Sequence, residues 1–210
     1  MEHLNAPVPD PASAPVPDPA TGERRRRLFL LILGAIVVAW LAGQWAYGAH
    51  EEREREAAAV REDVSGERVW EAGELTYGHV GKSVDYPMTP PVGGDHDKAW
   101  MTCDGTVYTE PVRDENAVHS LEHGAVWITY GTTATPADIE ALTARVARTP
   151  YTLMSPVPRQ SGTVTLSAWG HQLTVGTAAD ARVEQFISAY VQGPQTPEPG
   201  APCTGGRTAP

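Results

Sequence analysis

One segment constrains this chain more than any other: residues 28–49 (LFLLILGAIVVAWLAGQWAYGA) contain no Asp, Glu, Lys or Arg. As a helix rising ~1.5 Å per residue, this segment would extend about 33 Å, close to the hydrocarbon thickness of a bilayer. Trp40, Trp45 and Tyr47 lie toward one end, where amphipathic rings favour the membrane interface. The segment therefore predicts a transmembrane helix between two soluble parts.

The charges beside this segment predict its orientation. Four consecutive arginines at residues 24–27 directly precede it, and basic residues are enriched on the cytoplasmic side of membrane proteins. We expect a single-pass protein of the cell membrane, with a cytoplasmic N-terminus and an extracytoplasmic C-terminal domain. A cleaved signal peptide is the alternative, because Ala46-Tyr47-Gly48 is a weak cleavage pattern, but so long an apolar stretch is more typical of an uncleaved signal anchor.

The composition changes along the chain and predicts its domain boundaries. Residues 1–27 are Pro-rich, repeat the unit APVPDPA and end in the arginine cluster, as expected for a disordered cytoplasmic tail. Residues 50–68 are charged and helix-prone without an apolar stripe, which predicts a solvated stalk. Residues 69–193 have the pattern of a globular domain, and residues 194–210 form a Pro/Gly-rich tail that contains Cys203.

The globular segment predicts an α+β fold. Helices are expected after the capping residues Asn116, Thr135 and Asp180, and Gly124 should end the first of them. Strands are expected near residues 106–108, 125–131, 151–155, 163–169 and 171–175. This order predicts a single small extracytoplasmic α/β sandwich with a mixed or antiparallel sheet, preceded by one transmembrane helix.

Charge and motifs exclude several function classes. The net charge of −10 argues against a nucleic-acid partner, because phosphate contacts need clustered Lys and Arg. The sequence has no Walker-type loop, no G-x-G-x-x-G and no G-x-S-x-G, so it favours a role other than enzyme. The bilayer is the expected partner of residues 28–49, and an envelope protein would be a second partner.

A histidine cluster carries most of the chemistry. His119 and His123 are four residues apart, so on a helix both imidazoles project from one face and can bind one ion. His96, in a Gly-Gly-Asp-His-Asp turn, is the expected third ligand. Asp95 and Glu122 are expected to accept hydrogen bonds from the ring N–H groups.

The methionines bear on the identity of the ion. Met88, Met101 and Met154 offer thioethers, which would favour copper as Cu(I), with zinc as the alternative. His79 and His171 are expected to be ordinary surface or strand residues. The sequence thus predicts a membrane-anchored metal-binding module, with copper as the expected ion.

Two alternatives remain open. His119 and His123 can instead cap the last turn of a helix, which would leave a non-metal interaction or scaffold domain. Residues 119–123 also match H-x-x-E-H, in which Glu122 would be the general base of a small zinc hydrolase. A domain of ~125 residues leaves little room for a protease cleft.

Two cysteines complete the set of reactive residues. Outside the cytoplasm Cys103 and Cys203 would form a disulfide, since that compartment is oxidising. The closed loop of about 100 residues would stabilise the fold by up to ~4.7 kcal/mol on the chain-entropy model. The bond would also hold the Pro-rich tail on the domain.

Several stretches resemble one family. They are Asp85-Tyr86-Pro87, residues 89–94 with His96, Trp100 and Cys103, residues 115–130, residues 167–170, and residues 192–201 before Cys203. Over about residues 70–203 the chain resembles the largely actinobacterial, membrane-anchored family called domain of unknown function 3105. The resemblance implies the anchored, extracytoplasmic placement and no particular activity.

The same resemblance narrows the choice of metal ligands. It implies that Met88 and Met101 stand where glutamine is usual, whereas Met154 fits the family pattern. The expected ligands are therefore His96, His119, His123 and Met154.

Overall fold

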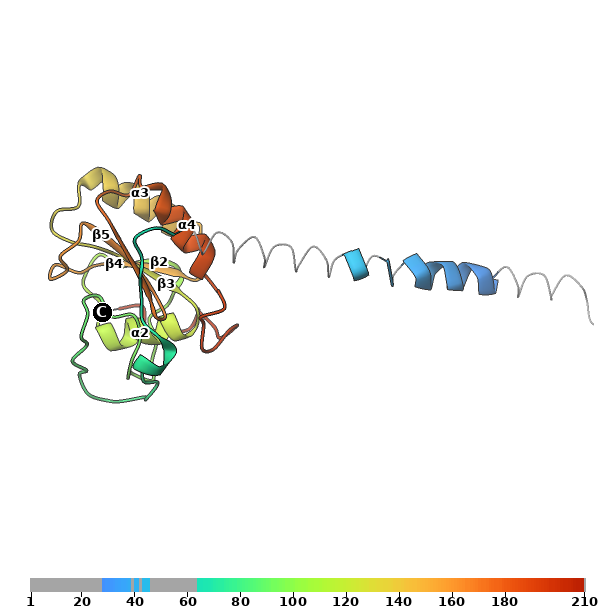
Figure 1. Cartoon of the computed structure of the whole chain (residues 1–210), viewed down its shortest axis with the longest axis horizontal. Helices are drawn as coiled ribbons and strands as arrows, with labels where there is room; N and C mark the ends of the chain where they lie inside the picture. Colours follow the sequence, from blue (N-terminus) through green and yellow to red (C-terminus); the bar gives the residue numbers. More distant parts are fainter. Residues whose placement is uncertain (1–27, 39, 42, 46–63, 210) are drawn as a thin grey trace, which may run out of the picture. The chain divides into compact units, whose positions relative to one another are not determined.

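The computed structural model describes residues 28–38, 40–41, 43–45 and 64–209, in two compact units, Met1–Arg53 and Glu54–Pro210 (Figure 1). The tail expected at residues 1–27 and most of the stalk expected at residues 50–68 lie outside the described residues.

The first unit contains one apolar helix. Leu28–Trp45 spans 18 residues with a mean hydropathy of 2.1, and within the described ranges it is the one helix long and apolar enough to cross a membrane. Its described side chains are exposed. Length and composition fit either a signal or an anchor.

The second unit is built on a six-stranded mixed sheet, which confirms the predicted α+β class. The strand order is β1-β6-β5-β3-β4-β2, with β4 parallel to β3 and β2 and the other pairs antiparallel. Gly170, with φ of +73°, makes the tight turn between β5 and β6. The strands are β1 Arg68–Val69, β2 Asp104–Val107, β3 Val126–Tyr130, β4 Thr152–Pro156, β5 Val164–Ala168 and β6 His171–Val175.

Helices cover both faces of the sheet. α3 (Pro136–Val146) and α4 (Ala181–Tyr190) lie on one face, α2 (Asp114–Glu122) lies on the other, and a short 3-10 helix, η2 (Ala72–Glu74), precedes the first long loop (Figure 1). α3 connects the parallel strands β3 and β4, since such strands need a crossover. It starts at a complete capping box, in which the Thr135 side chain accepts from the Asp138 amide and the Asp138 carboxylate accepts from the Thr135 amide.

α2 differs from its prediction at its first turn. It begins at Asp114, with Arg113 as an N-cap that makes no side-chain hydrogen bond. Asn116 therefore lies inside the helix, and its side chain donates to the Ala99 carbonyl instead of capping the helix. Gly124, with φ of +87°, follows the end of α2 as predicted.

The sheet separates two hydrophobic cores. Successive residues of a strand point to opposite faces, so Leu153 packs in the core beneath α2 while Met154 packs in the core beneath α3 and α4. The α2-side core contains the cysteine pair, and Trp127 is its largest fully buried side chain. This separation decides which side chains can reach a site on α2.

A C-terminal strap (residues 192–207) closes the α2 side. The predicted disulfide is confirmed: Cys103 bonds to Cys203 across a sequence separation of 100, and the Cys103 amide donates to the Cys203 carbonyl at 3.0 Å. A bridge between Met101 and Arg207 holds the strap further along. Together, the apolar helix and the disulfide indicate a secreted or membrane-anchored domain.

Candidate metal centre

α2 supplies two members of a cluster of polar side chains. His119 and Glu122 are three residues apart, so both project from one face of the helix. Both are buried, as are most side chains of this helix, because α2 is enclosed by the sheet, the loop before β2 and the strap. Burial of so many polar groups on one helix is uncommon unless they contact one another or a ligand.

A loop far from α2 in sequence supplies the other two members. His79 and His96 form an isolated parallel bridge, in which the His96 amide donates to the Gly78 carbonyl at 2.9 Å and the Val80 amide donates to the His96 carbonyl at 2.7 Å. Gly93 allows the loop to approach closely, since an added Cβ would lie 2.9 Å from the Leu75 side chain.

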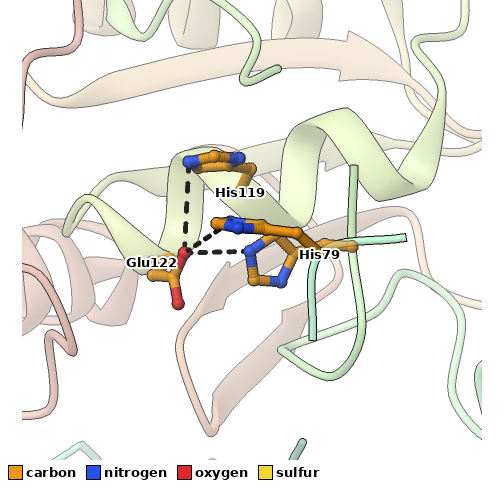
Figure 2. Close-up of side chains that lie close together, drawn as sticks. His79, His119 and Glu122 are labelled. Atoms are coloured by element: carbon orange, nitrogen blue, oxygen red, sulfur yellow. Dashed lines mark hydrogen bonds and ion pairs between the residues drawn. The ribbon is translucent and has the colours of Figure 1, made fainter. Parts of the chain in front are cut away.

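Three imidazole rings converge on one oxygen of the Glu122 carboxylate (Figure 2). Glu122 Oε2 lies 2.9 Å from His96 Nε2, 3.7 Å from His79 Nε2 and 4.0 Å from His119 Nε2. The four candidate ligand atoms lie within 4.8 Å of one another. Among the described residues this is the one group of three or more such side chains, and it could hold a metal ion.

Backbone carbonyls orient two of the rings. His96 Nδ1 donates to the Gly94 carbonyl at 2.8 Å, and His119 Nδ1 donates to the Asp97 carbonyl at 2.7 Å. A carbonyl can only accept, so each Nδ1 carries the proton and each Nε2 faces Glu122. Histidines that bind metals are usually held in this way.

The pKa shifts of His119 and Glu122 favour the protonation states that a bound metal needs. Burial lowers the pKa of His119 to about 4, against the hydrogen bond to Asp97, so this ring is neutral near pH 7. Burial would raise the pKa of Glu122, but the hydrogen bond and charge of His96 hold it below its ordinary value. The cluster therefore offers an ionised carboxylate beside a neutral imidazole, and both bind cations.

The pKa of His96 shifts in the opposite direction to that of His119. Burial would lower its pKa, but the hydrogen bonds to Glu122 and to the Gly94 carbonyl outweigh burial and raise that pKa. A proton on His96 Nε2 would balance the buried charge of Glu122, and a bound cation would replace that proton.

Aromatic rings surround the cluster and limit its contact with water. The Trp169 and His96 rings are nearly perpendicular with centroids 5.9 Å apart, and the Trp100 ring lies 5.7 Å from the His119 ring. The His79 side chain is 48% exposed, whereas those of His96, His119 and Glu122 are buried. Solvent therefore reaches the cluster through His79.

The structure brings some predicted site residues together and separates others. His96, His119 and Glu122 lie in the cluster, with Glu122 as close to the ring nitrogens as a ligand would be. His123 lies outside the group and faces Glu198, and Met154 packs beneath α3 and α4 on the far side of the sheet.

Asp95 and Asp97 make hydrogen bonds that hold the segments around the cluster. The Asp95 carboxylate accepts from the Gly78 amide at 3.0 Å and so holds the segment that carries His79. Asp97 contributes its backbone carbonyl to His119, while its carboxylate accepts from Arg113.

No sequence motif identifies His79 as a member of the cluster. It was expected to be an ordinary residue, but the bridge with His96 brings it into the cluster. No spacing rule connects residues 79 and 119, because their contact depends on how a long loop folds over α2.

Comparison with known families gives one finding. The sequence profile described as Protein of unknown function (DUF3105) matches residues 79–205, more than half of the chain. The match includes every residue of the cluster. Comparison with curated proteins and with solved structures gives no match.

Proposed function

The chain belongs to the DUF3105 family, whose description assigns no activity, and we propose that its domain is an extracytoplasmic metal-binding module. In this proposal His79, His96, His119 and Glu122 hold one divalent transition-metal ion. The convergence of three imidazole nitrogens on one buried carboxylate oxygen is the observation that carries the proposal.

Electrostatics supports a bound cation. A buried carboxylate is costly unless it is paired, and Glu122 is ionised near pH 7 because its pKa is held below the ordinary value. A divalent ion would balance this charge and contact all four side chains at once. The neutral His119 ring would bind through Nε2 without first losing a proton.

The donor set bears on which ion binds. Three imidazoles and one carboxylate suit Zn(II), Cu(II), Ni(II) or Fe(II), whereas Cu(I) prefers thiolates and thioethers. Met154 packs in the opposite core and offers no thioether to this group. We therefore favour a divalent ion over the Cu(I) that the methionines first indicated, with zinc and Cu(II) as the leading candidates.

Exposure of His79 indicates how the ion would be used. Structural zinc sites are closed, whereas sites that exchange their ion or a ligand keep one side accessible. Because the His79 side chain is 48% exposed, an ion here could be loaded and released. This supports buffering or delivery of the metal by a domain attached to the membrane through residues 28–49.

The main alternative is a scaffold domain that binds an envelope protein without metal. The 2.9 Å bond between His96 and Glu122 favours it, because a protonated His96 satisfies the carboxylate without an ion. The hydrolase alternative has less support, since Glu122 stands at ligand distance from three histidines and His123 does not join them.

Metal content of the full-length protein in detergent tests the proposal. The wild type should retain one tightly bound equivalent of Zn(II) or Cu(II) after dialysis, measured by mass spectrometry of the metal. His79→Ala and Glu122→Gln should weaken binding by at least about tenfold, and Glu140→Gln, an exposed change on α3, should not. A wild type that binds neither ion, while Glu122→Gln only lowers the melting temperature, would favour the scaffold domain.

A further inference from the structure

His123 is oriented by a backbone carbonyl, as His96 and His119 are, but it faces a different carboxylate. His123 is buried, and its Nδ1 donates to the Pro202 carbonyl at 2.9 Å, so its Nε2 carries the lone pair. That Nε2 lies 3.8 Å from Glu198 Oε2. The Glu198 side chain is 53% exposed and that of His123 is buried, so solvent reaches the pair from the Glu198 side.

The spacing of this pair matches that of two ligands on one ion. Ligand atoms at ~2.0–2.2 Å from a shared metal lie about 3–4 Å apart in common geometries. A separation of 3.8 Å is too long for a hydrogen bond. It is close to the 3.7 Å and 4.0 Å that separate Glu122 from His79 and His119.

The strap holds Glu198 in place although its side chain is exposed. The Glu198 amide donates to the Glu122 carbonyl at 3.0 Å, which fixes this residue at the end of α2. The Gln192 amide donates to the Gly124 carbonyl at 2.9 Å, and the disulfide at Cys203 fixes the strap beyond Glu198. The backbone of Glu198 is therefore held at the end of α2, from which its carboxylate reaches to 3.8 Å from His123 Nε2.

We propose that His123 and Glu198 form a second, solvent-facing site for a divalent cation beside the first. This inference rests on the proposed function, because it assigns a second ion of the same kind. The His119 and His123 rings lie 4.6 Å apart, so the two sites are neighbours on α2. With two protein ligands and water completing the coordination, the second site is the weaker and exchanges more readily.

Trp100 provides an optical signal for this site. Its ring lies 4.9 Å from His123 and 5.7 Å from His119, so a paramagnetic ion such as Cu(II) at either position should quench its fluorescence. The full-length protein in detergent is titrated with Cu(II) and with Zn(II). Calorimetry and Trp fluorescence recorded during the titration give the number of metal equivalents bound and the affinity of each.

Two variants remove the second site and spare the fold. Glu198→Gln changes an exposed side chain, and His123→Asn keeps a side-chain N–H that can donate to the Pro202 carbonyl while it removes Nε2. Glu140→Gln is the matched control, since it removes one exposed carboxylate from the opposite face. Melting temperatures of all variants show whether they remain folded.

The expected result is two equivalents in the wild type, with the second bound about tenfold or more weakly than the first. Both variants should lose the second equivalent and keep the first, whereas Glu140→Gln keeps both. A single equivalent in the wild type, or a second one that survives in both variants, overturns the second site and leaves the proposed function standing. A wild type that binds no metal overturns both.

Discussion

The two faces of the β-sheet bury different kinds of side chain. Beneath α3 and α4 lies an apolar cluster in which Phe186 and Leu142 are fully buried. Beneath α2 an apolar core is also present, but the helix itself buries Glu115, Asn116 and Glu122 together with its histidine. α3 has a complete capping box, whereas α2 begins without a side-chain cap.

This difference suggests that one face of the sheet stabilises the fold and that the other carries the candidate binding site. The α3/α4 face is held by packing and by local capping, which need no ligand. The α2 face contains buried polar groups that are costly unless they are paired, and a disulfide and a strap surround them. We infer that the α2 face is arranged for binding and that the other face supports it.

The largest expected effect on stability comes from a substitution that disrupts packing beneath α3 and α4. Phe186→Ala should lower the free energy of unfolding by about 3–5 kcal/mol, because it leaves a cavity in a closed core. Urea denaturation followed by circular dichroism measures this change. The variant should keep its metal stoichiometry in the folded state, and loss of metal from a folded variant would contradict the separation of the two faces.

The second-largest effect should come from removing the disulfide that holds the strap on the α2 face. The double change Cys103→Ser and Cys203→Ser should lower the free energy of unfolding by about 2–4 kcal/mol, because it frees a loop of 100 residues in the unfolded chain. It should also weaken metal binding, since the strap supplies the Pro202 carbonyl and Glu198. Reduced wild-type protein is the control and should behave like the variant.

Metal removal should have a smaller effect that depends on concentration. At a free metal concentration of 100 times Kd, binding to the folded state adds about 2.7 kcal/mol to the free energy of unfolding. Differential scanning calorimetry with Zn(II) and then with a chelator measures the shift in melting temperature. A chelator effect of equal size in Glu122→Gln would show that the shift does not come from this cluster.

The smallest effect is a pH dependence on the α3/α4 face. Hydrogen bonds from Thr135, from the Ala178 amide and from Thr177 hold the pKa of Asp138 well below its ordinary value. A depressed pKa stabilises the fold above the unfolded value of ~3.9, and this contribution is lost as pH falls below it. Asp138→Asn should therefore lower the melting temperature at pH 7 more than at pH 3, and equal losses at both would contradict this role.

Local patterns in the sequence were sufficient for most of the fold. Apolar periodicity located β3 to β6 and the helices α3 and α4, and Thr135, Asp180 and Gly124 marked helix ends. The start of α2 was misplaced because Asn116 is a good N-cap by type, yet tertiary contact with Ala99 uses its side chain.

The candidate site was predictable only where its residues share one element or motif. His119 and Glu122 lie on one helix, and the turn around His96 marked that histidine as a candidate ligand. His79 gave no such signal. Met154 was an expected ligand by residue type, but strand alternation directs it into the opposite core.

The sequence by itself determined the apolar helix, the α+β class and the family, because hydropathy, periodicity and motif residues are properties of neighbouring positions. Only the tertiary structure decided which histidines meet Glu122 and which one faces Glu198. The physical reason is that these contacts join a loop, a helix and a strap, and each depends on backbone hydrogen bonds between residues far apart in the chain.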